Sequence, residues 1–255
     1  SDLLGASFVY NRDPFTGAES DLRRSGRRVR CGDRYDYDYD ILRREAVLFG
    51  AGHYRYGRFG LSFGAELAFA DLGRIGRYEK ATLPGGRSYG PSAVNRFTPY
   101  QVYVSARYAF SARHRMRAEL FAGEYMPHYE EIFLSPDYSN ALADGIRMLR
   151  MVGAQVEYRV PLGRFVVAEA AGYLIGTRDA MRVERYYDDL YGTYCDLSLS
   201  GIAKLDWGVE AGVRVELTER LGLLAVLSVG NNLYRGEPAV AVYDDASGKL
   251  LLRDD

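Results

Sequence analysis

Three aspartates separated by single tyrosines are the first residues whose spacing could do chemistry. They are Asp36, Asp38 and Asp40, within the stretch YDYDYD. A calcium loop of the EF-hand type places acids at positions 1, 3 and 5, glycine at position 6 and glutamate at position 12. Counted from Asp36, the last two positions hold Ile41 and Val47, so this pattern fails. A looser calcium site in an outer loop and a solvated strand extension remain as alternatives, and the strand is favoured, with no metal site predicted.

A run of arginines, RRSGRRVR, offers a second kind of chemistry, the binding of anions. In an external loop it could meet lipopolysaccharide phosphates or an anionic substrate such as a ferric siderophore, because the guanidinium group pairs well with phosphate and carboxylate. The alternative is a charged loop without a ligand. The candidate binding residues are Arg23, Arg24, Arg27 and Arg28.

Four tyrosines in RYYDDLYGTY could stack on sugars, haem or aromatic siderophores. They are Tyr186, Tyr187, Tyr191 and Tyr194. Tyrosines also gather at the rim of membrane proteins, at the level of the lipid headgroups, so the two interpretations stand side by side.

Catalysis and nucleic-acid binding find no support in the sequence. There is no Ser/His/Asp set, nucleophile elbow or paired-carboxylate motif, and the two cysteines and three histidines lack zinc spacing. The net charge of −1 gives no field that favours nucleic acid. We therefore expect a protein that is not an enzyme, carries no cofactor and binds no nucleic acid.

Alternation of apolar residues with small or polar ones defines the elements that must position these groups. The segment WGVEAGVRVEL, residues 207–217, is the clearest, with Trp, Val, Ala and Leu on one parity and Gly, Glu and Arg on the other. A period of two residues over this length is typical of a β-strand. Together with less regular segments the pattern predicts about nine strands, at 3–10, 46–56, 59–69, 100–110, 115–123, 148–159, 165–176, 207–217 and 221–232.

The connections between these strands alternate between short and long. The short ones lie near 56–58, 111–114, 161–164 and 218–222, and the long ones at 11–44, 71–98, 126–146 and 177–202. Outer-membrane barrels have short periplasmic turns and long extracellular loops. The alternation therefore predicts an all-β protein, the wall of an antiparallel transmembrane β-barrel. A soluble antiparallel sheet with one solvated face is the alternative.

The two parities of the strands assign a lipid face and a lumen face. A charged side chain on the lipid face costs roughly 2–4 kcal/mol at the bilayer midplane, so the parity that carries charges must face the lumen. The predicted lumen-facing residues are Glu66, Arg107, Glu119, Glu157, Glu169, Glu210 and Arg214.

The first long strand is assigned in the same way. Val47, Phe49 and Ala51 are expected on lipid, with Gly50 and Gly52 in the lumen. If the pleat continues toward the N-terminus, the three aspartates share the lumenal parity and overlook the barrel mouth, while the tyrosines between them turn outward.

Three segments resemble the TonB-dependent outer-membrane receptors, especially the group with an N-terminal carboxypeptidase-regulatory-like domain. They are AELFAGEYMPHYEEIFLSP (118–136), DWGVEAGVRVELTERLGLLAVLSVGNN (206–232) and LYRGEPAVAVYDDASGK (233–249). In the first, Pro127, Tyr129 and Phe133 match an aromatic-rich segment around a proline. The resemblance implies an outer-membrane location and the import of a scarce ligand such as a siderophore or glycan. It implies three kinds of partner: outer-membrane lipid and lipopolysaccharide, the imported ligand, and the TonB system.

The family also has features that this chain does not show. Its receptors carry a plug domain, a TonB-binding segment and a barrel of about 22 strands, whereas we find neither plug nor TonB box, and nine strands is an odd number. The expectation is a single β-barrel segment over residues 1–255, a fragment of a larger barrel whose missing plug contacts TonB. The alternative is a small complete porin or adhesin barrel, closed by pairing of strands 45–56 and 221–232. A soluble lipocalin-like binding barrel would need its apolar face inward, and it is disfavoured because the opposite parity combines Glu and Arg with glycines that are too small to shield a surface.

Overall fold

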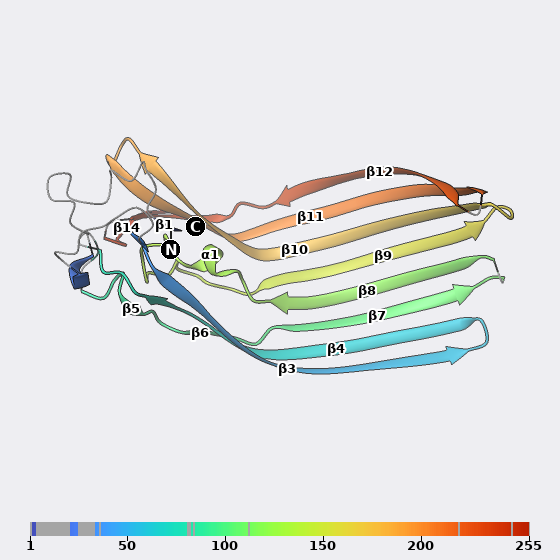
Figure 1. Cartoon of the computed structure of the whole chain (residues 1–255), viewed down its shortest axis with the longest axis horizontal. Helices are drawn as coiled ribbons and strands as arrows, with labels where there is room; N and C mark the ends of the chain where they lie inside the picture. The colour runs from blue at the N-terminus through green and yellow to red at the C-terminus, as the bar shows by residue number, and fades with distance from the viewer. Residues whose placement is uncertain are drawn as a thin grey trace.

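The structure is a computed structural model, and it describes residues 2–3, 21–24, 34–35, 37–80, 83, 85–111, 113–218, 220–245 and 247–254. It is all-β, with 71% of residues in strands and 3% in helices. One antiparallel sheet of 12 strands dominates the fold (Figure 1). Its long strands are β3 (Tyr39–Tyr56), β4 (Phe59–Gly76), β7 (Tyr100–Ala109), β8 (Arg115–Tyr125), β9 (Leu149–Pro161), β10 (Val166–Asp188), β11 (Thr193–Thr218) and β12 (Leu221–Arg235). These eight strands confirm the predicted segments from 46–56 onward.

The remaining elements are short. Two strands, β5 (Gly90–Pro91) and β6 (Asn95–Phe97), pair with β4, and β13 (Ala239–Asp244) joins β11 to β14 (Leu250–Asp254). A separate two-stranded pair joins β1 (Asp2–Leu3) and β2 (Arg34–Tyr35), and the helical turns are η1 (Leu22–Arg24) and α1 (Tyr129–Ile132). Of the stub expected at 3–10, only Leu3 is described. No helix in the described ranges is long and apolar enough to cross a bilayer.

The eight long strands form a meander, each hydrogen-bonded to the next along the chain. The short connections all lie at one end of the sheet, on the right of Figure 1, and the long ones lie at the other, which we call the long-loop end. One predicted loop is wrong. Residues 177–202 are not a loop, because β10 and β11 remain paired as far as Asp188 and Thr193. Register shifts between Thr177 and Arg182 break the two-residue period there, which hid the strand from a pattern search.

Residues paired across an antiparallel ladder share a face of the sheet. The pairs, followed from strand to strand, show that the seven residues predicted to face the lumen all lie on the same side of the sheet. We call this side the polar face. For example, Arg117 pairs with Glu157, and Glu169 pairs with Arg159. The opposite side, the apolar face, carries Trp207 and Val209 among others.

The predicted orientation of β3 is wrong. Phe49 pairs with Glu66, so Val47, Phe49 and Ala51 lie on the polar face, and Gly50 and Gly52 lie on the apolar face. The segment Val-Leu-Phe is apolar on both parities, so local alternation could not decide its orientation. The register against β4 decides it.

Four glycines lie beneath aromatic rings of the neighbouring strand. Each is paired directly with the aromatic residue, and a Cβ at the glycine would overlap the ring. The pairs are Gly52 with Phe63, Gly64 with Tyr103, Gly153 with Phe121, and Gly208 with Tyr173. This packing gives the sheet a structural use for its many glycines and aromatic residues.

We expect Gly153→Val to destabilise the fold by about 1–3 kcal/mol, because the Phe121 ring must leave its place above the backbone. Gly172→Val is the matched control, since the nearest atom to a Cβ there is the Gly208 carbonyl oxygen at an ordinary 3.8 Å. Denaturant titration of both variants measures the difference. Equal loss of stability in the two would contradict the ring-over-glycine packing.

The buried core sits at the long-loop end rather than along the sheet. We call residues 126–148, which include α1, the cap segment. They pack against β4, β10 and β13 at the long-loop end of the sheet. Ile132 and Phe133 of the cap segment are completely buried. The other core members are Leu72, Leu134, Ala143, Met181, Ala241 and Tyr243.

Candidate functional site

The apolar face is an extended exposed surface of the described sheet. No element of the described chain covers it, and its side chains are exposed: Leu48 is 66% exposed, Val152 61% and Leu227 69%. On this face, β7 presents Tyr100, Val102, Val104, Ala106 and Tyr108 in that order. Tyrosine therefore bounds the aliphatic stretch at both ends. An uncovered apolar surface that spans eight strands far exceeds what soluble monomers expose.

Charged residues are absent from the middle of this face. Over the segments 46–56, 59–69, 100–108, 116–122, 152–160, 166–176, 207–217 and 221–229, the described residues that point to the apolar side include no Asp, Glu, Lys or Arg. Charges return only toward the long-loop end, as with Glu124 paired with Arg150.

The polar face carries ion pairs and hydrogen bonds, both within β8 and between neighbouring strands. Arg117 contacts Glu119 at 2.5 Å, and Arg159 contacts Glu169 at 3.2 Å. The hydroxyl of Ser228 donates to Glu210 at 3.3 Å. A hollow of about 640 Å³ lies among these contacts.

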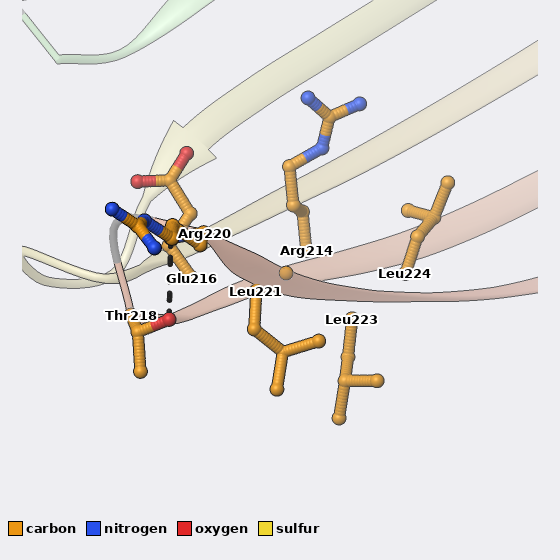
Figure 2. Close-up of a pocket in the computed structure, with 8 residues that line it drawn as sticks. Arg214, Glu216, Thr218, Arg220, Leu221, Leu223 and Leu224 are labelled. Atoms are coloured by element: carbon orange, nitrogen blue, oxygen red, sulfur yellow. Dashed lines mark hydrogen bonds between the residues drawn. The ribbon is translucent and has the colours of Figure 1, made fainter.

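The turn between β11 and β12 shows the two faces side by side (Figure 2). Leu221 and Leu223 point to one side of the hairpin, while Arg214 and Leu224 point to the other. The amide of Arg220 donates to the Thr218 hydroxyl at 3.2 Å and tightens the turn. These side chains border a hollow of about 520 Å³ at the edge of the sheet.

At the long-loop end, Arg74 of β4 holds the cap segment. Its guanidinium donates to the carbonyl oxygens of Pro136 at 2.6 Å and Asp137 at 3.2 Å, and to Asn140 Oδ1 at 2.5 Å. It also donates to Ser88 O at 3.0 Å. Burial lowers the pKa of Arg74 to about 10, so the group still carries its charge at neutral pH.

The cap segment is attached to the opposite flank of the sheet as well. The Ser135 hydroxyl donates to Asp196 of β11 at 2.7 Å, and the amide of Asp144 donates to the Tyr243 hydroxyl of β13 at 3.2 Å. Since β4 lies near one edge of the sheet and β13 near the other, the cap segment bridges the two flanks. Burial raises the pKa of Asp196 to about 6, and nearby Asp245 adds to the effect.

This pKa predicts a pH-dependent stability. Between its ordinary pKa near 4 and about 6, folded Asp196 binds a proton that the unfolded chain has lost, so the free energy of unfolding falls as pH rises through this window. At about 1.4 kcal/mol per pKa unit, the loss is about 2–3 kcal/mol. We expect Asp196→Asn to be more stable than wild type at pH 8 and equal to it at pH 4, in thermal unfolding. Asp71→Asn, at a half-exposed carboxyl that lies 3.8 Å from Arg96, should bring no gain in stability at pH 8.

A cavity of about 310 Å³ lies between the cap segment and the polar face. Lys204 Nζ lies 3.1 Å from Asp206 Oδ2, while Asp206 Oδ1 is buried without a hydrogen-bond partner in the described part of the protein. Three methionines contribute to the wall: Met126, Met151 and Met181. The wall is mixed, because the charged residues Glu131, Arg147 and Asp179 also line the cavity.

The predicted aspartate cluster does not form in the described residues. Asp36 lies outside them, and Asp40 forms an ion pair with Arg77. The predicted parity is reversed: Asp40 pairs with Ile75 on the apolar side, whereas Tyr39 turns inward against the Arg74 guanidinium, 4.9 Å from the ring centroid. The carbonyl oxygen of Asp38 accepts from the Arg77 amide at 2.7 Å. Within the residues the structure describes, no group of three or more His, Cys, Asp or Glu could hold a metal.

The arginine run is only partly described. Arg23 contacts Glu79 at 2.9 Å, and Arg24 contacts Asp21 at 4.0 Å, while Arg27 and Arg28 lie outside the described residues. The two described arginines are thus engaged with carboxylates of the protein itself.

Of the four predicted tyrosines, three are exposed near the tip of the β10–β11 hairpin, and the fourth, Tyr186, is hydrogen-bonded within the protein. Tyr187 and Tyr194 pair directly across the β10–β11 hairpin with ring centroids 5.3 Å apart, and both are about half exposed. Tyr191 lies exposed in the turn beyond them. Tyr186 pairs with Cys195 instead and donates to Asp188 at 3.0 Å; burial and this hydrogen bond raise its pKa to about 12.

Sequence reasoning missed Arg74 and Asp196. Their partners in the cap segment lie about 60 residues away along the chain, beyond the reach of any local pattern. The sequence holds one indication of Arg74: it lies on the same side of its strand as Ala68, Ala70 and Leu72, where a charged residue interrupts a run of apolar ones.

Comparison with known proteins adds no family or neighbour, because no family model, no curated protein and no solved structure matches the chain.

Proposed function

We propose that the sheet is part of the wall of an outer-membrane β-barrel, belonging to a TonB-dependent receptor that binds and imports a scarce ligand. One observation carries the proposal: eight antiparallel strands present an uncovered, uncharged apolar face, with the charges on the opposite face. In lipid this face needs no cover, whereas in water it would drive aggregation. The role is binding and transport rather than catalysis.

The polar face would line the lumen in this proposal. Its glycines, glutamates and arginines suit a wet interior, and its charges would each cost roughly 2–4 kcal/mol on lipid at the midplane. The short turns would lie on the periplasmic side, and the cap segment with the β10–β11 hairpin would lie outside the cell. Lipopolysaccharide and the imported ligand are the expected partners there.

The receptor assignment rests on the sequence resemblance and on the open edges of the sheet. In the described chain, β3 pairs only with β4, and β12 pairs only with β11. Both edge strands are apolar on both faces, as at Leu48 and Phe49 of β3. Unpaired edges are not tolerated in hydrocarbon, so further strands of a larger barrel would complete the wall.

The test is insertion into lipid. The chain is refolded from urea with and without vesicles of a short-chain phosphatidylcholine and then digested with proteinase K. We expect the strand region to be protected only with vesicles, with cleavage confined to the long-loop end. A monodisperse, protease-resistant monomer in detergent-free buffer would overturn the proposal.

A small complete barrel is the second candidate, because the strands that would span the membrane number eight, an even number, and the cap segment joins both flanks. Closure would require β3 to pair with β12. With Cys31 and Cys195 replaced by serine, Leu48→Cys is combined in turn with cysteine at residues 223, 225, 227 and 229 of β12. An intramolecular disulfide in one of these pairs would favour the closed barrel over the receptor wall.

A further inference from the structure

Arginines gather in the hollow of about 640 Å³ on the polar face, near the short turns. The hollow is lined by residues from β7 to β12. Five arginines and three glutamates contribute, so the lining carries two more positive than negative charges. The arginines are Arg107, Arg115, Arg117, Arg159 and Arg214.

The register places four of these arginines in two like-charged pairs. Arg107 of β7 lies directly opposite Arg117 of β8, and Arg115 of β8 lies directly opposite Arg159 of β9. Like charges at directly opposed positions destabilise a sheet. A wall that needed only to be polar would not place them so.

The protein neutralises one arginine of each of these two pairs. Arg117 contacts Glu119 at 2.5 Å, its Nε donates to the Ser105 hydroxyl at 3.0 Å, and Arg159 contacts Glu169 at 3.2 Å. In the described part of the chain, Arg107, Arg115 and Arg214 of this lining have no carboxylate within 4.0 Å. Three exposed guanidinium groups are left beside two that are held in place, and of the three only Arg107 and Arg115 lie directly opposite another arginine.

We propose that this hollow binds a small anion that carries carboxylate or phosphate groups, with Arg107 and Arg115 as its main ligands. The guanidinium fork binds such groups through two parallel hydrogen bonds. Both arginines are exposed, so an anion can bind to them without the protein first having to bury either guanidinium charge. The inference deepens the proposed function, on which its biological role rests, by naming the chemistry of the ligand that the wall would pass.

The experiment is isothermal titration calorimetry of the full chain, folded in detergent micelles, with inorganic pyrophosphate and with citrate. The two probes distinguish a phosphate ligand from a carboxylate ligand. The test variant is Arg107→Gln with Arg115→Gln. The control variant, Arg178→Gln with Arg235→Gln, removes the same charge from the long-loop end of the apolar face. Circular dichroism verifies that each variant keeps its strand content.

We expect saturable binding of one probe to wild type and to the control variant, and affinity at least about tenfold weaker in the test variant. Equal affinity in all three proteins, or no saturable binding to wild type, would overturn the inference. Insertion into vesicles is measured separately. A chain that inserts but binds neither probe refutes the anion site alone, whereas one that binds but does not insert refutes the membrane proposal alone.

Discussion

Leu227→Arg should weaken folding into lipid vesicles by roughly 2–4 kcal/mol, whereas Ser228→Arg should change it little. The two residues are neighbours on β12, both exposed, and they point to opposite faces of the same strand. Arginine at 227 would lie in the uncharged apolar band. At 228 it would lie beside Glu210, whose carboxylate already accepts a hydrogen bond from Ser228.

These two variants distinguish a sheet that lies in a membrane from a soluble sheet. In water, substitutions at exposed positions usually stay within about 0.5 kcal/mol, so both variants would resemble wild type. The measurement is the denaturant midpoint for release from vesicles, with tryptophan fluorescence of Trp207 as the signal. Equal midpoints for the two variants would count against lipid contact of the apolar face.

The strand pattern could be predicted because alternation is a local property. Segments such as 207–217 show one parity of Val and Ala against one of Glu and Arg, and the structure contains the strand. The prediction failed where the period breaks. The bulges near Ala180 shift the parity within β10, and the Val-Leu-Phe of β3 carries no parity signal.

The candidate site was less predictable for a different reason. Parity places Arg107 and Arg115 on one face, but only the register brings Arg115 opposite Arg159. Register depends on the turns and on packing across strands, which one sequence does not specify. The inward fold of the cap segment likewise depends on contacts such as Arg74 with Asn140, which are 66 residues apart.

Arg74→Met should release the cap segment. Arg74 is 2% exposed, and its guanidinium satisfies four buried or half-buried acceptors, which methionine would leave without a donor. Leaving a buried acceptor without its donor typically costs about 1–3 kcal/mol. Arg74→Lys should be intermediate, because an ammonium keeps the charge but cannot reproduce the planar fork.

Hydrogen exchange read by mass spectrometry is the measurement. We expect residues 126–148 of the Arg74→Met variant to exchange much faster, while the strands near the short turns keep their protection. Arg77→Met is the control, since its ion pair with Asp40 is exposed and such pairs contribute about 0–1 kcal/mol. If the cap segment exchanged equally slowly in both variants, Asp196 and the apolar core around Phe133 would be sufficient to hold it. The bridge between the two flanks would then not depend on Arg74.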